Sequence, residues 1–125
     1  MLGWHISVYR QTDGGTLPAT TKAKYGRRIA VWQAGVSGLD WLDRLVSEGR
    51  AIDLGGCGYP YNYTAMAGDL LPQLADGPPH ANMLWTFGDH DIILNGWAGR
   101  TVFDQVAANE CRPDEWLLVE AWDES

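Results

Sequence analysis

Apolar and polar side chains alternate at the start of the chain, and this alternation constrains the fold more than any other feature. Trp4, Ile6 and Val8 are separated by His5 and Ser7. Successive side chains of a β-strand point to opposite faces of a sheet, so a period of two predicts a strand with one buried face. The backbone groups of such a strand need partners on neighbouring strands. The chain must therefore supply further strands to flank this one.

Further segments are rich in the β-branched and aromatic residues that favour strands. Residues 28–33 and 115–122 carry apolar side chains at both parities, which is typical of central strands. Residues 83–87 alternate, and a polar turn that begins at Gly88 leads into the apolar run 92–94, a pattern that predicts a hairpin over 83–94. A short strand is also expected over residues 51–54.

Capping residues mark the helices. Ser37 and Asp40 have the spacing of a capping box, and Gly49 stands where a left-handed residue commonly closes a helix. Thr101 and Asp104 repeat the capping-box spacing further along the chain. The expected helices cover residues 38–48, 69–76 and, over about two turns, 101–109.

The order of these elements favours an α+β fold. Strands and helices alternate irregularly, without the steady rhythm of parallel βαβ units or the glycine motifs of nucleotide-binding loops. We expect a mainly antiparallel sheet of about five strands, with two or three helices packed on one face. The 125 residues, of which 46% are hydrophobic, have the size and apolar content of a single globular domain spanning residues 1–125.

The net charge of the chain restricts the classes of partner that it can bind. Nine Lys and Arg against 16 Asp and Glu give a formal net charge of -7, which opposes binding to nucleic acid and to anionic membrane surfaces. No apolar run approaches the ~18 residues of a membrane span, and the first residues lack the pattern of a signal peptide. We expect a cytoplasmic protein whose partner is another protein, one with a basic surface.

Tryptophan is several times more frequent than in an average chain, with seven in 125 residues. Burial in an expected strand accounts for Trp4, Trp32, Trp85 and Trp116. Three others need a different explanation: Trp41 on the side of its helix away from the leucines, Trp97 beside a turn, and Trp122 in the acidic tail. Because exposed tryptophans dominate many protein interfaces, these three are candidate partner-binding residues.

The segment from Gly55 to Tyr63 has an unusual composition. Its glycines permit a close backbone approach to a ligand, and Tyr59, Tyr61 and Tyr63 offer amphipathic rings for a partner. The alternative is a glycine-rich turn whose tyrosines cover the core. Within it, Cys57 is a candidate nucleophile if a histidine acts as its base, although no catalytic signature surrounds it.

Two groups of charged residues could bind a ligand, but a structural role is the simpler interpretation of each. Asp89, His90 and Asp91 include metal-ligand types, but adjacent strand residues face opposite ways, so a polar hairpin tip is favoured and neither a metal nor a cofactor is expected. The basic group contains Lys22, Lys24, Arg27 and Arg28. Such a group could hold an acidic ligand, and a solvated strand edge is the simpler interpretation.

The acidic tail supplies the last candidates. Trp122, Asp123 and Glu124 combine an aromatic anchor with a charged rim, which suits docking into a basic groove. The alternative is a frayed terminus beyond a buried tryptophan.

These features favour a small binding protein or inhibitor over an enzyme. An immunity protein, antitoxin or phage inhibitor masks a basic or catalytic surface through complementarity and needs no catalytic residues. A ligand-binding domain or enzyme that uses Cys57 or a histidine is the second hypothesis, and it requires a pocket that brings these groups together. A structural homo-oligomer, such as a homodimer, is the third.

Overall fold

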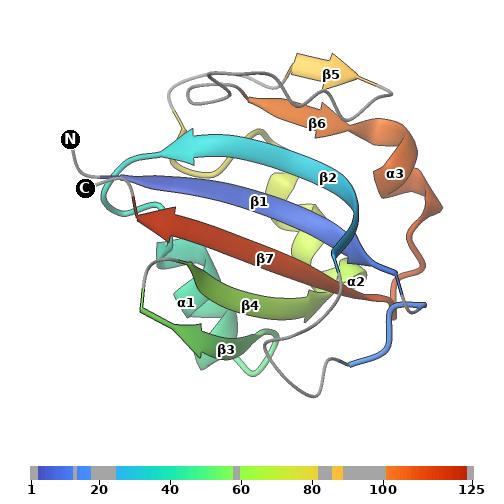
Figure 1. Ribbon diagram of the computed structural model, residues 1–125, viewed down its shortest axis with the longest axis horizontal. Helices are drawn as coiled ribbons and strands as arrows, with labels where there is room; N and C mark the ends of the chain where they lie inside the picture. The colour runs from blue at the N-terminus through green and yellow to red at the C-terminus, as the bar shows by residue number, and fades with distance from the viewer. Residues whose placement is uncertain are drawn as a thin grey trace.

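A single sheet organises the molecule. The computed structural model describes residues 3–12, 14–17, 25–57, 60–81, 86–88 and 101–123, the segment 86–88 by its backbone alone. Over these residues the sheet has seven strands in the order β3-β4-β7-β1-β2-β6-β5 (Figure 1). Six of them form an antiparallel array, and β5 runs parallel to β6 at one edge. The strands are β1 (Trp4–Gln11), β2 (Tyr25–Ala34), β3 (Ile52–Gly56), β4 (Tyr61–Met66), β5 (Thr86–Gly88), β6 (Val102–Asp104) and β7 (Trp116–Asp123).

Short helices accompany the sheet. Figure 1 shows α1 and α2 behind the strands, and α3 directly after β6. They are α1 (Asp40–Ser47), α2 (Ala67–Leu70), the 3₁₀ helix η1 (Leu71–Leu74) and α3 (Gln105–Glu110). The expected mainly antiparallel sheet with short helices is thus confirmed, with seven described strands in place of about five. Packing of all helices on one face stays a prediction.

The two faces of the sheet differ in chemistry. Ile6 lies opposite Trp32 on β2 and opposite Ala121 on β7, and all three are fully buried. This core face packs against α1, as shown by the rings of Trp32 on β2 and Trp41 on α1, which lie 5.9 Å apart. The opposite face includes Ser7 of β1, which pairs with Glu120 of β7. We call it the polar face.

The first helix begins later than its capping signal predicts. α1 starts at Asp40, and Leu39 occupies the N-cap without a side-chain hydrogen bond, so the assignment of Ser37 as N-cap is wrong. The predicted end is confirmed: Gly49 has φ of 76°, and its N–H donates to Val46 O. The next N–H, that of Arg50, donates to Leu45 O, which completes a Schellman motif.

The glycine-rich segment belongs to two paired strands, which favours the glycine-rich turn over the ligand loop. β3 runs to Gly56 and β4 begins at Tyr61, and the two strands pair directly. Gly55 and Gly56 have φ of 97° and 121°, values that favour glycine. A Cβ at Gly56 would also collide with the Pro60 carbonyl. The glycines therefore serve the strand bulge and the close packing of the hairpin.

The segment after Thr101 is also corrected. Val102 and Phe103 belong to β6, which pairs with β2, so the expected helix starts only at Gln105. Asp104 is its N-cap and accepts a hydrogen bond from Ala107 N at 3.0 Å. A carboxylate is a strong cap, and the β-branched and aromatic residues before it favour a strand.

Two other expectations are met in part. Residues 69–76 were expected to form one helix, whereas α2 begins at Ala67 and gives way to the 3₁₀ helix η1, whose first turn contains Pro72. Of the hairpin expected over 83–94, the structure describes only β5, and the other residues of that segment lie outside the described residues.

Candidate functional site

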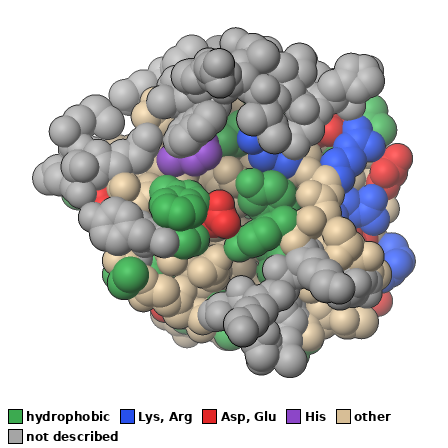
Figure 2. Space-filling model, viewed as in Figure 1, with side chains coloured by type: hydrophobic (Ala, Val, Ile, Leu, Met, Phe, Trp, Pro, Cys, Tyr) green, Lys and Arg blue, Asp and Glu red, His purple; other side chains and the backbone are tan. Residues whose placement is uncertain are grey.

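The polar face of the sheet carries aromatic side chains and a carboxylate on the neighbouring strands β1 and β7. Along β1 this face presents His5, Ser7 and Tyr9, and along β7 it presents Glu120 and Trp122. His5 lies opposite Trp122, and Ser7 lies opposite Glu120. Figure 2 shows this side of the molecule, where hydrophobic side chains flank an acidic one. The face thus combines large rings with a carboxylate.

Five residues of this face form what we call the aromatic–acid cluster: Tyr9, Tyr25, Asn62, Glu120 and Trp122. Trp122 Nε1 donates to Glu120 Oε1 at 2.7 Å. The Tyr25 hydroxyl donates to Asn62 Oδ1 at 2.9 Å, although β1 and β7 separate their strands. The ring of Tyr25 also lies 4.8 Å from that of Tyr9, at an angle of 57°. Tyr25 therefore reaches across the face and fixes one side of the cluster.

Burial sets the protonation of the groups beside Glu120. Burial raises the pKa of Tyr25 far above its ordinary value, and the nearby Glu120 carboxylate adds to this effect. Burial also lowers the pKa of His5 to about 4, with help from the positive charge of Arg28. At neutral pH, Tyr25 and His5 are both uncharged. They therefore bring no positive charge to Glu120.

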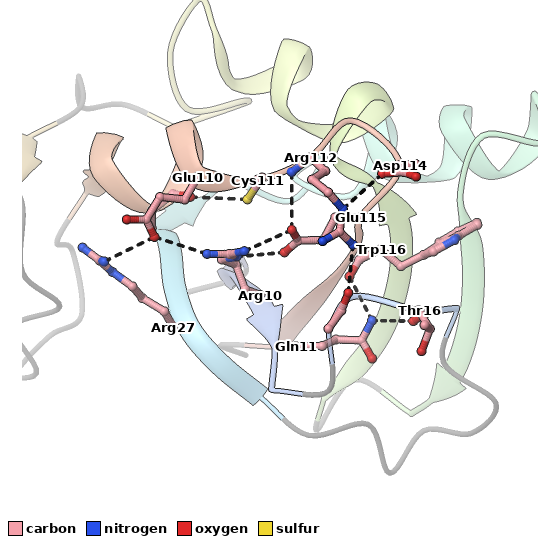
Figure 3. A network of polar contacts seen from close by, with 12 residues as sticks. Arg10, Gln11, Thr16, Arg27, Glu110, Cys111, Arg112, Asp114, Glu115 and Trp116 are labelled. Carbon is pink, nitrogen blue, oxygen red and sulfur yellow. Dashed lines mark hydrogen bonds and ion pairs between the residues drawn. The ribbon is translucent and has the colours of Figure 1, made fainter.

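A second group of polar residues lies where β1 ends and β7 begins, and Figure 3 shows it in detail. Arg10 Nε lies 2.8 Å from Glu115 Oε2, and Arg10 Nη2 lies 3.1 Å from Glu115 Oε1. The Glu115 side chain is only 2% exposed. The Arg10 hydrogen bond holds the pKa of Glu115 below its ordinary value, against the opposing effect of burial. This bidentate pair keeps a buried carboxylate ionised.

The Arg10–Glu115 pair extends to neighbouring elements. Arg10 Nη1 also lies 3.3 Å from Glu110 Oε1 at the end of α3. A similar pair links β2 to β6, where Arg27 Nη2 lies 2.9 Å from Asp104 Oδ2. We call these residues the arginine network: Arg10, Arg27, Asp104, Glu110 and Glu115. Each of its three carboxylates lies against an arginine of the network, so we assign it a structural role.

The expectation that Trp41 faces away from the core is wrong. The residue is only 4% exposed, it stacks near Trp32, and its Nε1 donates to Gly38 O at 2.9 Å. Trp41 belongs to the same buried stripe of α1 as Leu42 and Leu45. Tryptophan in this position completes the core, and its indole N–H is already satisfied.

The tyrosines and the tail are divided between the two faces. Tyr61 packs its ring 5.6 Å from that of Trp4, and Tyr63 is buried with its hydroxyl donating to Asp43 Oδ1 at 3.3 Å. Both therefore support the core. Trp122 is 39% exposed, and Asp123, which ends β7, is half-buried. The other candidates, Tyr59, Trp97 and Glu124, lie outside the described residues.

The groups considered for chemistry are not gathered by the described residues. Cys57 is exposed just after β3. Hollows of about 340, 360 and 540 Å³ border the helices, and Cys57 lines none of these three. Within the described ranges, no three His, Cys, Asp or Glu side chains could hold a metal ion together. Asp89, His90 and Asp91, like Lys22 and Lys24, lie outside them.

Reasoning from the sequence missed most of the aromatic–acid cluster. Glu120 and Trp122 are two residues apart in a strand, so the period of two could have placed both on one face. Tyr9 could have been assigned to the same face by the alternation of β1. Tyr25 and Asn62 left no signal, because their contact depends on the curvature of the whole sheet.

Comparison with known proteins found no matching family model, no similar curated protein and no similar solved structure. The polar face and its charges are therefore the basis for the proposed function.

Proposed function

We propose that this chain is a small acidic binding protein, of the immunity-protein, antitoxin or phage-inhibitor type, that masks a basic or catalytic surface of a partner protein. The observation that carries the proposal is Trp122, a tryptophan 39% exposed on the polar face and hydrogen-bonded to a carboxylate. Large exposed aromatic rings beside charged groups are typical of interface hot spots.

Charge supports the same proposal. A net charge of -7 accelerates association with a basic surface and disfavours acidic partners. No helix of the described residues is long and apolar enough to cross a membrane. We propose the cytoplasm as the site of binding, and helices packed on one face of the sheet would leave the polar face to the partner.

Affinity capture from the organism that encodes this chain tests the proposal. The wild-type protein is immobilised at low salt beside Trp122→Ala, which keeps the net charge unchanged and so controls for charge attraction alone. We expect the wild type to retain a basic protein that elutes as salt is raised. The purified pair should lose roughly 30-fold in affinity with Trp122→Ala, the effect of one hot-spot residue.

A second exposed apolar residue gives a matched control. Val36→Ala shortens an exposed side chain between β2 and α1, and its affinity should equal that of the wild type. Recovery of no protein by the wild type at low salt, or equal recovery by Trp122→Ala, would contradict the proposal.

A further inference from the structure

Glu120 is the carboxylate at the centre of the aromatic–acid cluster. It is half-buried on the polar face, and in the described part of the chain it forms no ion pair. Among the described residues it contacts neutral groups, the indole N–H of Trp122 and the hydroxyl of Tyr25. A partly buried charge gains most from an opposite charge that reaches it, because surrounding protein reduces screening by water. The site is therefore suited to a positively charged group.

The aromatic–acid cluster also has more acceptors than donors. The single proton of the Tyr25 hydroxyl goes to Asn62 Oδ1, while Glu120 also faces that hydroxyl. Only one Glu120 oxygen receives the Trp122 N–H, although each carboxylate oxygen can accept two hydrogen bonds. A ligand that complements this arrangement must bring several N–H donors.

Rings on both sides of Glu120 define the shape of that ligand. Trp122 follows it along β7, and the Tyr9–Tyr25 pair lies on the other side. A guanidinium is flat, stacks on aromatic rings and carries five N–H donors in fixed directions. An ammonium concentrates three donors at one point and has no flat surface. The cluster therefore favours arginine over lysine.

We propose that the aromatic–acid cluster binds one arginine side chain of the partner protein, with the guanidinium hydrogen-bonded to Glu120 and packed against Trp122. This inference rests on the proposed function, which supplies the partner protein. The basic surface expected of that partner is complementary to the net charge of -7 on this chain. The contact thus centres on one arginine, and the net charge of -7 supplies attraction over longer distances.

A titration of the whole chain tests this proposal without the partner. The Trp122 indole N–H resonance, assigned by its loss in Trp122→Phe, is followed while N-acetyl-arginine amide or N-acetyl-lysine amide is added at constant ionic strength. We expect saturation by the arginine compound with a Kd on the order of 1–10 mM, and at least roughly fivefold weaker binding of the lysine compound.

Two charge-matched variants locate the effect. Glu120→Gln should weaken the arginine compound at least about tenfold, whereas Asp114→Asn should change the Kd less than about twofold. Asp114 suits this control because its side chain is 81% exposed and lies outside the cluster. If Glu120→Gln disturbs the folded spectrum, Asn62→Asp replaces it and should tighten arginine binding at least about threefold.

The outcomes separate this proposal from the proposed function. Equal Kd values for the two compounds, or equal losses in Glu120→Gln and Asp114→Asn, would overturn the arginine site and leave a captured partner unaffected. Saturable arginine binding in a chain that captures no protein would remove the proposed function and leave the arginine site standing.

Discussion

Two glutamates only five positions apart have opposite surroundings. Glu115, just before β7, is buried and receives both a bidentate arginine and the backbone N–H of Arg112. Glu120, inside β7, is half-buried, and its contacts with described residues are to neutral groups. The same residue type therefore holds the chain together at one position and remains available to a ligand at the other. Variants of the two positions should separate folding from binding.

The largest effect is expected at Glu115. Glu115→Gln leaves Arg10 without its buried counter-charge and should lower the free energy of unfolding by about 3 kcal/mol, because breaking such a pair leaves a charge uncompensated. Urea denaturation at pH 7 measures this loss. Asp114→Asn removes an equal charge from an exposed position and should change stability by less than about 0.5 kcal/mol. Similar losses in both variants would show that the arginine network contributes no special stability.

A pH effect of the next size is expected from His5. Its folded pKa of about 4 is below the unfolded value of 6.5, so the unfolded chain binds more protons between these values. Stability is then fully present above pH 6.5 and falls as the pH falls toward 4. Between pH 7 and pH 5 the loss from this residue is about 2 kcal/mol. The measurement is the difference in pH dependence between wild type and His5→Gln, and parallel curves for the two would refute it.

Asp104 allows capping and ion pairing to be compared. Asp104→Ala removes the N-cap of α3 and the pair with Arg27, and should cost about 1–2 kcal/mol. Asp104→Asn retains a capping oxygen and should recover more than half of that loss, because the ion pair is partly exposed. If thermal unfolding shows equal losses for the two variants, the Arg27 pair has the larger role.

The smallest effect on stability is expected in the aromatic–acid cluster. Glu120→Gln keeps an acceptor for the Trp122 N–H and removes a charge that forms no ion pair with a described residue, so its unfolding free energy should stay within about 0.5 kcal/mol of wild type. Denaturation alongside Glu115→Gln gives the direct comparison. A loss near that of Glu115→Gln would place Glu120 with the residues that hold the fold.

Local patterns predicted the strands better than the site. The alternation around Ile6 and the end of α1 at Gly49 follow from nearest neighbours in the chain, and both were confirmed. The strand expected over 51–54 and the glycine-rich turn after it were anticipated, whereas β4 was not, because its strand structure depends on pairing with β7. Trp41 was misplaced because its position was judged partly against Leu39, which precedes the helix, whereas its i, i+4 spacing to Leu45 places it on the buried face.

The site depended on contacts that span the sheet. Trp122 was a candidate from the sequence, but the sequence did not show that its indole N–H bonds to Glu120 rather than to another acid of the tail. The contact between Tyr25 and Asn62 crosses two intervening strands, and no pattern of spacing along the chain encodes it. The sequence pattern did not contain the arrangement of the whole sheet, which brings these residues together.

The position of β1 between β2 and β7 has a consequence for how the protein is made. The hairpin with β2 is local, whereas Arg10 and Glu115, which join β1 to the start of β7, are 105 positions apart. During synthesis, β1 can pair with β2 early. Its other edge stays unpaired until β7 has left the ribosome. The apolar edge beside Ile6 and Val8 is then exposed to other nascent chains. Folding efficiency in the cell should therefore depend on translation rate and chaperone supply.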